Sequence, residues 1–313
     1  MKGIVRDPSS PLGAAVVDLP DPPDPGLVEV LVRMRLAPIN PADRLVIAGR
    51  YAPPEGLPDV IGAEGMGIVE AIGGNVSALT PGMRVILLSR GNWSEWRCVP
   101  AADLIVVPDA LPDAQAAILR INPATAAHLL DRLALSCGDW LIQNAAGSSV
   151  AGWVRRLAAR RGVRTINVVR GTTPAASSEI FLNDGDDLAD RVLEMAKSQP
   201  VGALDAVAGT ATGRLAQCLA ATGALLVYGH LSGEPCSIPS TLLTTKSLNV
   251  RGFTLRTAEA AEDPLRRARR YEELGALAEQ EPEPIAGIYP FDQLETALAA
   301  AANKPGGRVL LSA

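Results

Sequence analysis

The sequence has few of the side chains that bind metal ions or form disulfides. Among its 313 residues there are four cysteines and two histidines. They are Cys98, Cys137, Cys218, Cys236, His128 and His230. No C-x-x-C pair occurs, which excludes the usual structural zinc site and redox dithiol, and no grouping supplies the three or four ligands of a catalytic zinc ion. We therefore expect no bound metal.

The chain also lacks long apolar runs and a positive net charge. No segment reaches the roughly 18–20 apolar residues of a membrane span, and Met1-Lys2-Gly3 leads into mixed sequence without a signal peptide. The net charge of −5 argues against nucleic acid or an anionic membrane surface as the main partner. The default expectation is a cytoplasmic protein that acts on a small molecule.

Composition and texture indicate a globular enzyme with two domains. Hydrophobic residues make up 48% of the chain and charged residues 20%, and the length suits about two domains. Short β-like runs, broken by Gly and Pro, occupy the first part of the chain: Val28–Arg35, Gly67–Ile72, Arg84–Leu88 and Leu104–Val107. They predict a compact, barrel-like β domain.

After Pro112, Ala-rich helices alternate with apolar strands. The expected strands are Leu141–Gln143, Thr165–Val169, Ala203–Val207, Ala224–Tyr228 and Leu248–Phe253. This alternation predicts a doubly wound parallel sheet. A helix over Phe291–Ala302 and a strand over Arg308–Leu311 follow, and could belong to either domain. The basic run at 266–270 (RRARR) is expected to be a solvated helix face.

The most informative segment is Asp139–Arg170. A strand at Trp140–Gln143, a turn of small residues, a helix and a second strand form half of a dinucleotide-binding βαβ unit. Small residues let backbone N–H groups approach a pyrophosphate, and the helix N-terminus favours its charge. The residue that ends the second strand meets the adenosine ribose. An acid there suits the 2′-hydroxyl of NAD and an arginine the 2′-phosphate of NADPH, so Arg170 indicates NADPH.

The turn itself departs from the G-x-G-x-x-G pattern. It reads AAGSSVAG over residues 145–152. Taken alone, such a loop could belong to any α/β protein.

Short motifs along the whole chain carry a resemblance to a known family. They are 39–43 (INPAD), 48–51 (AGRY), 62–67 (GAEGMG), 91–93 (GNW), 121–126 (INPATA), 142–146 (IQNAA), 165–170 (TINVVR), 228–233 (YGHLSG) and 248–253 (LNVRGF). In these motifs and their order the chain resembles the medium-chain dehydrogenase/reductases. Within them it is most similar to the zinc-free NADPH-dependent 2-enoyl thioester reductases, with quinone oxidoreductases next.

The resemblance implies an α/β fold of two domains. A GroES-like β-rich catalytic domain would span residues 1–112, with residues 265–313 returning to it, and a Rossmann-type NADPH-binding domain would span residues 113–264. Zinc-dependent relatives carry cysteine where this chain has Asn40 and histidine where it has Ala63. Without that Lewis acid, the reduction of an activated C=C bond is the better fit.

Three residues are candidates for catalysis. Hydride delivery to an enoyl thioester leaves an enolate that needs stabilisation and a proton. The resemblance places Tyr51 as the proton donor, although a tyrosine packed against Pro53 and Pro54 is the alternative. Asn40 matches a position that lines the nicotinamide and substrate cleft, or it belongs to an Asn-Pro turn. Trp93 walls an acyl pocket or fills the core.

The resemblance also implies a set of cofactor-binding residues. They are Asn122, Thr125, Gly147, Ser148, Ser149, Val150, Arg170, Tyr228, Gly229, His230, Phe253, Leu255 and Arg308. For Arg308 a surface position is an equal alternative, and His230 is more readily a backbone-contact position than a base. His128 is expected to be structural.

Two departures concern the coenzyme pocket. Relatives usually carry glycine at the positions of Ser149 and Ala151, whose Cβ atoms restrict backbone approach. The segment Gly171–Asp187 is short and polar, and we expect it to lack the helix and the next strand of the usual pattern. The adenine side of the pocket could then be open.

Three hypotheses for function follow. The first is an NADPH-dependent enoyl thioester or enone reductase, the second is a quinone oxidoreductase, and the third is a crystallin-like or regulatory protein that binds NADPH without catalysis. The resemblance further implies a homodimer.

Overall fold

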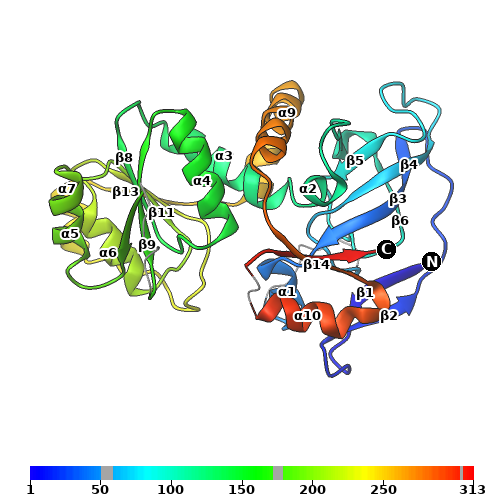
Figure 1. Cartoon of the computed structure of the whole chain (residues 1–313), viewed down its shortest axis with the longest axis horizontal. Coiled ribbons are helices and arrows are strands. Elements are labelled where there is room, and N and C mark those ends of the chain that lie inside the picture. The colour runs from blue at the N-terminus through cyan, green and yellow to red at the C-terminus, as the bar shows by residue number, and fades with distance from the viewer. Residues whose placement is uncertain (51–58, 172–178, 304–305) are drawn as a thin grey trace. The chain divides into compact units, whose positions relative to one another are not determined.

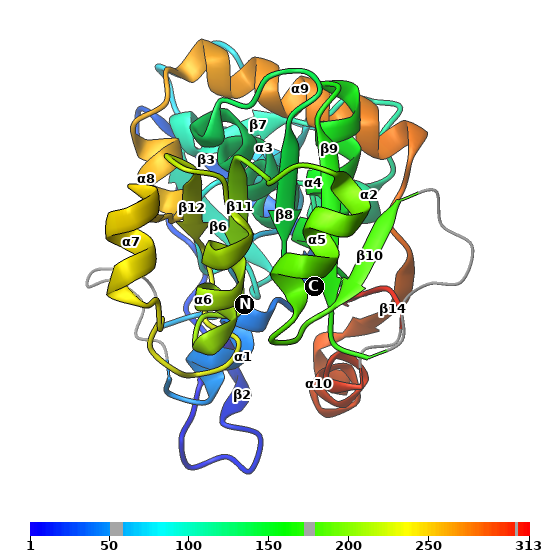
Figure 2. The same ribbon diagram turned by 90° about the vertical axis from the view of Figure 1, so that its left-hand side faces the viewer.

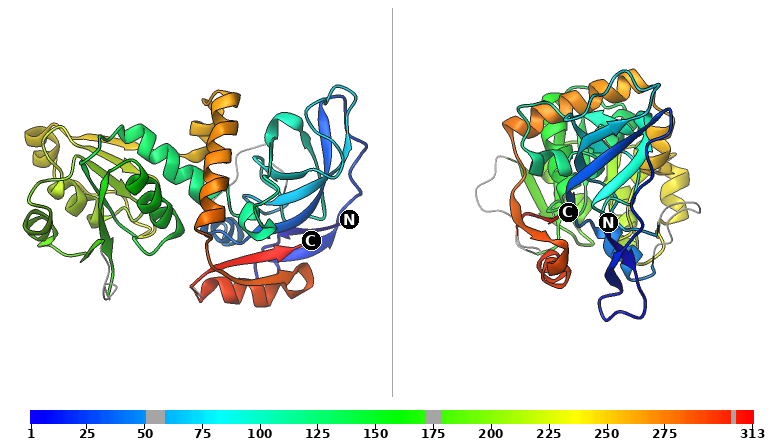
Figure 3. Two further views of the ribbon diagram at one scale, coloured as in Figure 1. Left: turned by 45° about the horizontal axis from the view of Figure 1, so that its top comes forward. Right: turned by 90° about the vertical axis from the view of Figure 1, so that its right-hand side faces the viewer.

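The computed structural model describes residues 1–50, 59–171, 179–303 and 306–313, and the chain divides into two compact units (Figure 1). Unit 1 comprises Met1–Ile121 and Asp263–Ala313, and unit 2 comprises Asn122–Glu262. Both termini belong to unit 1, where Figure 3 marks them. Within the described ranges, no helix has the length and apolar character needed to cross a bilayer.

Unit 1 is built on a mostly antiparallel sheet. The strand order is β14-β15-β3-β4-β5-β7, and β6 pairs with β3 outside this order. The bounds are β3 Glu29–Pro38, β4 Met66–Ile72, β5 Arg84–Leu87, β6 Trp96–Pro100, β7 Leu104–Val106, β14 Ile285–Pro290 and β15 Arg308–Ser312. A separate pair joins β1 (Lys2–Arg6) to β2 (Ala14–Asp18). Along β3, Val30, Val32 and Met34 alternate into a core, as in a strand with one buried face.

Helices and the C-terminal tail complete unit 1. The helices are α1 Pro41–Ile47, η1 Ala101–Asp103, α2 Asp113–Ala117, α9 Pro264–Gln280, η2 Phe291–Gln293 and α10 Leu294–Ala302. β15 pairs antiparallel with β3, which places the tail in the unit 1 sheet. Phe291, Leu294 and Ala297 pack in one core cluster with Trp93. The basic run at 266–270 lies on α9, and most of it is exposed.

Unit 2 contains a parallel sheet with the order β10-β9-β8-β11-β12-β13 (Figure 2). The bounds are β8 Trp140–Gln143, β9 Arg164–Val169, β10 Ile180–Asn183, β11 Gly202–Asp205, β12 Ala224–Val227 and β13 Asn249–Gly252. Every neighbouring pair is parallel. Counted within the unit, the order is 3-2-1-4-5-6, the arrangement of dinucleotide-binding sheets. The order reverses between β8 and β11, where such sheets bind their ligands.

Helices cover both faces of this sheet. They are α3 Ile121–Leu133, α4 Ser149–Arg160, α5 Leu188–Ala196, α6 Thr210–Cys218, α7 Ser240–Lys246 and α8 Leu255–Ala260. Figure 1 shows α4 on one face and α5 and α6 on the other. Ile142, Ile166 and Ala203, from the central strands, are fully buried, because a parallel sheet covered on both faces needs apolar strands. The predicted fold class is confirmed.

The predicted strands are present, with different ends. The strand expected at Val28–Arg35 continues to Pro38, and the one expected at Ala203–Val207 ends at Asp205. The sequence did not predict β1, β2, β6 or β14. The expectation that Gly171–Asp187 lacks a strand is wrong, because β10 pairs with β9 at the sheet edge. This strand has only four residues, too few to show a strand pattern, and it is a strand because it forms hydrogen bonds with its neighbour β9.

The division between the units lies at Ile121/Asn122 instead of the expected 112/113. The reason is α2, which directly follows Pro112 and contacts β3, β4 and α9 of unit 1. The chain crosses back at Glu262/Asp263, close to the expected 264/265.

Candidate active site

The turn between β8 and α4 is the first element of the candidate site. Ala145 has a φ of +48°, in the left-handed region that alanine rarely adopts. Ser148 is the N-cap of α4, and its hydroxyl accepts a hydrogen bond from the Ala151 N–H at 3.2 Å. A Cβ added to Gly147 would meet no atom of the described residues within 4 Å. Open space therefore lies against the backbone just before a helix N-terminus, where an anion is favoured.

Arg170 lies at the end of β9, next to this turn in the sheet. β9 ends at Val169 and runs parallel to β8, so both strands end at the same edge. The Arg170 side chain is exposed and has no hydrogen bond or ion pair with any described residue. Its guanidinium is available for a dianionic group such as a phosphate.

A buried carboxylate joins the loops on the two sides of the point where the strand order reverses. Asp205, at the end of β11, has no exposed surface. It accepts hydrogen bonds from Asn144 Nδ2 (2.6 Å), the Thr212 hydroxyl (2.6 Å), the Val207 N–H (2.8 Å) and the Ala208 N–H (3.0 Å). Asn144 Oδ1 in turn accepts the Ala206 N–H at 2.8 Å. The loops after β8 and β11 are thereby held in one relative position.

The loop after β12 packs against the loop after β11. A Cβ on Gly229 would lie 2.8 Å from the Ala206 carbonyl oxygen, so only glycine permits this approach. The Tyr228 hydroxyl is buried without a hydrogen-bond partner among the described residues. Burial and then the Asp205 charge raise its pKa, while Ser148 acts in the opposite direction. An orphaned hydroxyl beside the Ser148 turn is suited to a polar ligand.

The remaining predicted cofactor residues lie on several elements of unit 2. Ser149 and Val150 form the first turn of α4, and His230 is exposed in the loop after β12. Phe253 follows β13 and is buried, with the Arg132 guanidinium 5.3 Å from its ring centroid, and Leu255 begins α8. The strand ends bring these residues to one edge of the sheet. Asn122 and Thr125 lie instead on α3, which precedes β8.

In unit 1, the side-chain amide of Asn40 is held at both ends. Its Nδ2 donates to Glu64 Oε1 at 3.0 Å, and its Oδ1 accepts from Arg308 Nη2 at 2.7 Å. Arg308 is also 3.7 Å from Glu64 Oε1. The structure places Arg308, predicted as a cofactor residue, on Asn40 in unit 1. We call Asn40, Glu64 and Arg308 the Asn40 cluster.

Glu64 is the centre of this cluster. Its side chain is 1% exposed, and its Oε2 accepts the Ile121 N–H at 2.7 Å, at the last residue of unit 1 before the crossing. Burial raises the pKa of Glu64, and the Arg308 charge is the largest opposing influence. The orientation of the Asn40 amide is therefore set by a buried acid, Glu64, which also binds the backbone of Ile121, where the chain leaves unit 1.

A second buried acid lies beside the cluster. Asp43 Oδ2 accepts the Asn40 N–H at 3.0 Å, which secures the first turn of α1. Its Oδ1 lies 3.7 Å from Arg90 Nη2. Burial raises the pKa of Asp43 to about 6 despite these partners.

Trp93 and Tyr51 are the other two residues that the sequence predicted as catalytic. Trp93 has no exposed surface, packs in the unit 1 core, and donates from Nε1 to the Pro38 carbonyl at 3.2 Å. This position fits the core alternative, and the catalytic assignment of Trp93 stays a prediction. Tyr51 lies outside the described residues, and its role stays a prediction.

Comparison with known proteins gives a match to a family model and matches to whole relatives, which differ in extent. Residues 25–109 match the family model described as the alcohol dehydrogenase GroES-like domain. The chain is also 36% identical, over 242 residues, to the mitochondrial enoyl-acyl-carrier-protein reductase of Dictyostelium discoideum, with 72% of this chain and 69% of that protein covered. The chain belongs to the enoyl-acyl-carrier-protein reductase family. Its resemblance to the zinc-free medium-chain dehydrogenase/reductases is confirmed.

Solved structures agree with this membership. A mycobacterial quinone oxidoreductase superposes with a TM-score of 0.85 at 27% identity, covering 100% of this chain and 99% of the other. A mycobacterial protein complexed with NADPH gives the same TM-score and identity, with 100% of both chains covered. This enoyl-acyl-carrier-protein reductase family member therefore shares the fold of an NADPH complex over its whole length.

In this reductase family member, the described residues contain no group of three or more His, Cys, Asp or Glu side chains that could hold a metal ion. The family resemblance places Asn40 at one of the two positions that carry ligands in zinc-dependent relatives. Ala63, at the other, contributes its backbone carbonyl to Arg120 at 2.8 Å.

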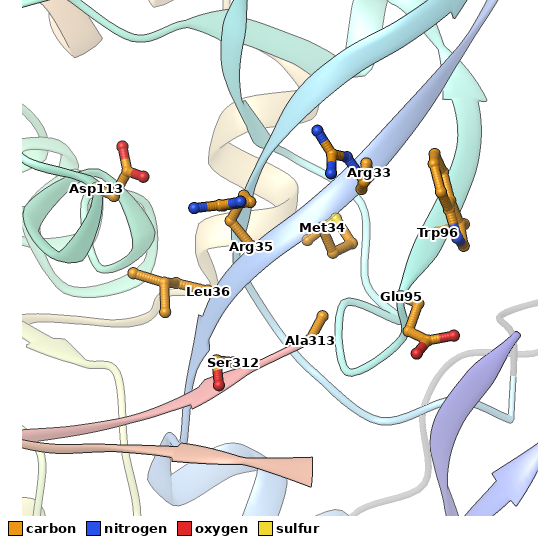
Figure 4. Close-up of a pocket in the computed structure, with 9 residues that line it drawn as sticks. All are labelled: Arg33, Met34, Arg35, Leu36, Glu95, Trp96, Asp113, Ser312 and Ala313. Atoms are coloured by element: carbon orange, nitrogen blue, oxygen red, sulfur yellow. The ribbon is translucent and has the colours of Figure 1, made fainter.

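A groove of about 420 Å³ lies elsewhere in unit 1 (Figure 4). Arg33 and Arg35 of β3, Trp96 of β6 and the C-terminal Ala313 are part of its lining. It shares no residue with the Asn40 cluster.

Sequence reasoning missed Glu64, Asn144 and Asp205. Two of them, Glu64 and Asn144, stand inside the motifs GAEGMG and IQNAA, and Asp205 is a charged residue inside an apolar run. A lone acid within an apolar segment is the signal that could have found Asp205, because a buried charge needs partners.

Proposed function

We propose that the protein reduces the C=C bond of a 2-enoyl thioester with NADPH. The observation that carries the proposal is Arg170, unpaired among the described residues, at the end of the second strand of a dinucleotide-type sheet in a chain of this family. An acid at that position would have favoured NAD.

The residues of unit 2 fit the coenzyme. The open space against Gly147 admits a pyrophosphate oxygen, the Ser148 turn and the α4 N-terminus favour its charge, and Arg170 suits the 2′-phosphate. The unpartnered Tyr228 hydroxyl supplies a further polar group beside Ser148. When bound, NADPH supplies the hydride for the β-carbon of the substrate.

The Asn40 cluster of unit 1 serves the substrate carbonyl. Among the described residues, Nδ2 of Asn40 donates only to Glu64, so its second N–H can donate to an oxygen on which negative charge develops. Glu64 and Arg308 fix that donor in advance of the reaction, which avoids reorganisation. The proton for the α-carbon is assigned to Tyr51 by the family resemblance.

A turnover assay with crotonyl thioester tests the proposal. We expect NADPH consumption and formation of the saturated thioester, and Asn40→Ala to slow turnover about 100-fold through the lost donor, as for oxyanion-hole groups. Tyr51→Phe tests the donor assignment separately. NADPH binding without turnover of any activated alkene would instead support the non-catalytic hypothesis.

Quinone reduction is the second candidate, favoured by the 27% identity to a mycobacterial quinone oxidoreductase over the whole chain. Hydride transfer to a quinone needs no α-carbon proton, so Tyr51→Phe should leave it unchanged. If both the parent and the Tyr51→Phe protein turn over a benzoquinone faster than the thioester, quinone reduction is the function.

The partner proposed for assembly is a second copy of the chain. β13 is an edge strand of the unit 2 sheet, and all four of its residues are exposed. Such an edge presents unpaired backbone groups that another strand can join. Sedimentation should show a dimer that Val250→Asp, on this edge, converts to monomer, whereas a monomeric parent protein would refute the proposal.

A further inference from the structure

The turn between β8 and α4 holds its conformation without a glycine at its left-handed position. Ala145 adopts φ +48°, and the Ser148 N–H bonds to its carbonyl at 2.8 Å. The Ala146 N–H bonds to the Val168 carbonyl of β9 at 3.1 Å. These bonds fix one side of the turn, but the peptide that joins Ala146 to Gly147 needs a further contact to set its direction.

Arg155, in the second turn of α4, supplies that contact. Its Nη1 donates to the Ala146 carbonyl at 2.7 Å, and its Nε lies 3.2 Å from Glu179 Oε2. Its guanidinium carbon stands 5.5 Å from the ring centroid of Phe181 on β10. Arg155 therefore links the turn to the edge strand that the sequence did not predict. Burial lowers its pKa, and Glu179 acts in the opposite direction.

The geometry of a trans peptide gives this contact a consequence. The C=O and N–H of one peptide point in opposite directions. With the Ala146 carbonyl held toward Arg155, the Gly147 N–H points away from it. That N–H has no hydrogen bond to a described residue, and the space at Gly147 is open.

We propose that Arg155 is a positioning residue for the coenzyme pyrophosphate. It holds the Ala146–Gly147 peptide so that the Gly147 N–H is presented to a phosphate oxygen. This contact offsets the absence of glycine at the positions of Ser149 and Ala151, where Cβ atoms restrict backbone approach. The inference rests on the proposed function, because it requires a coenzyme. Arg155 acts through the turn, whereas Arg170 contacts the 2′-phosphate itself.

This difference makes the two arginines separable. The pyrophosphate is common to NADPH and NADH, so the loss of Arg155 weakens both coenzymes by the same factor. The loss of Arg170 weakens NADPH alone. The ratio of the two dissociation constants therefore reports which role an arginine has.

The test measures coenzyme binding by calorimetry and steady-state kinetics for Arg155→Met, which keeps an apolar stem over Phe181 but removes every donor. We expect the Kd of NADPH and of NADH to rise about tenfold each, with their ratio unchanged. The KM for coenzyme should rise while kcat at saturation stays within about twofold. Arg155→Lys keeps one donor, so its Kd for each coenzyme should lie between that of the parent and that of Arg155→Met. The control is Arg156→Met on the same helix. The guanidinium carbon of Arg156 lies 4.4 Å from the ring centroid of Trp153. This variant should bind both coenzymes as the parent protein does.

Parent-like coenzyme affinity in folded Arg155→Met protein would overturn the assignment and leave the proposed function intact. A change in the NADPH/NADH ratio would also overturn it. If Arg155→Met does not fold, Arg155→Lys carries the same comparison. A parent protein that binds neither coenzyme would refute the proposed function, and this assignment with it.

Discussion

At the scale of single residues, the coenzyme site is defined as much by empty space as by side chains. Within the part of the chain that the structure describes, a Cβ on Gly147 would meet no atom within 4 Å, and the φ of Gly147 is not in the left-handed region. The folded chain therefore does not itself require glycine at this position. The requirement comes from the ligand.

Gly147→Val tests this separation. We expect a melting temperature close to that of the parent, because a Cβ at this position meets no atom of the described residues within 4 Å. The Kd for NADPH should rise at least about tenfold, because the added methyl groups occupy the phosphate approach. Thermal melts and calorimetric titration measure the two effects. A large drop in melting temperature with unchanged affinity would contradict the account.

The Asn40 cluster gives a second residue-scale prediction. In Glu64→Gln, a single amide oxygen must replace two carboxylate oxygens that accept Asn40 Nδ2 and the Ile121 N–H, and the charge opposite Arg308 is lost. We expect kcat with the enoyl thioester to fall about tenfold to 100-fold with NADPH affinity unchanged. Glu70→Gln is the control, because Glu70 is an exposed partner of Arg33 at 3.6 Å. Equal kcat in both variants would remove the positioning role of Glu64.

At the scale of elements, three loops after β8, β11 and β12 form one packed layer. The Leu231 N–H bonds to the Ala206 carbonyl at 3.0 Å, and the Ser232 N–H to the Val207 carbonyl at 2.9 Å. Asp205 fastens this layer to the loop after β8 through Asn144. The position of Tyr228 thus depends on loop packing.

Gly229→Ala is expected to disturb that packing. Its Cβ would stand 2.8 Å from the Ala206 carbonyl oxygen, a backbone atom that cannot turn aside. We expect the free energy of unfolding to fall by about 1–3 kcal/mol, with weaker NADPH binding. Urea unfolding monitored by circular dichroism measures it. Gly74→Ala is the control, because its Cβ would lie 3.8 Å from the nearest described atom, a methyl carbon of Leu27, which is an ordinary contact.

The elements also show how far sequence can predict this fold. The bounds of β8 were predicted, and so was the place of Arg170 at the end of β9, because apolar runs and turn residues are local signals. The early end of β11 was not, because Asp205 binds the N–H groups of Val207 and Ala208 and so bends the chain away from the sheet. β10 was missed because four residues carry too little pattern to distinguish a strand from a loop.

At the scale of the whole molecule, the site depends on contacts between residues far apart in sequence. Glu64 meets Asn40, Ile121 and Arg308, and no periodicity or spacing connects these positions. The family resemblance placed Asn40 and Arg308 in the site, but it assigned Arg308 to the coenzyme. Only the folded chain shows that Arg308 holds the Asn40 amide.

Buried acids in unit 1 should also give the molecule a pH-dependent stability. The pKa of Asp43 is raised from 3.8 to about 6, so the folded state binds this proton more tightly than the unfolded chain. The stability from this proton is complete below pH 3.8 and is lost as pH rises through about 6.

Asp43→Asn removes this titration. The unfolding free energy of the parent minus that of the variant should fall by about 2 kcal/mol between pH 4 and pH 7. Unfolding curves measured at several pH values across this range give the difference. The titration of Glu64 cancels in this difference, because both proteins contain Glu64. A difference that is constant with pH would show that Asp43 is not protonated in the folded state.

The most direct test of the account is a calorimetric titration of NADPH and NADH, side by side, into the parent and Arg170→Ala proteins. The parent should prefer NADPH by about tenfold to 100-fold, and Arg170→Ala should bind both coenzymes alike, because the 2′-phosphate loses its charged partner. Arg164→Ala, at the opposite end of β9, should keep the preference. Equal affinity of the parent for the two coenzymes would contradict the account.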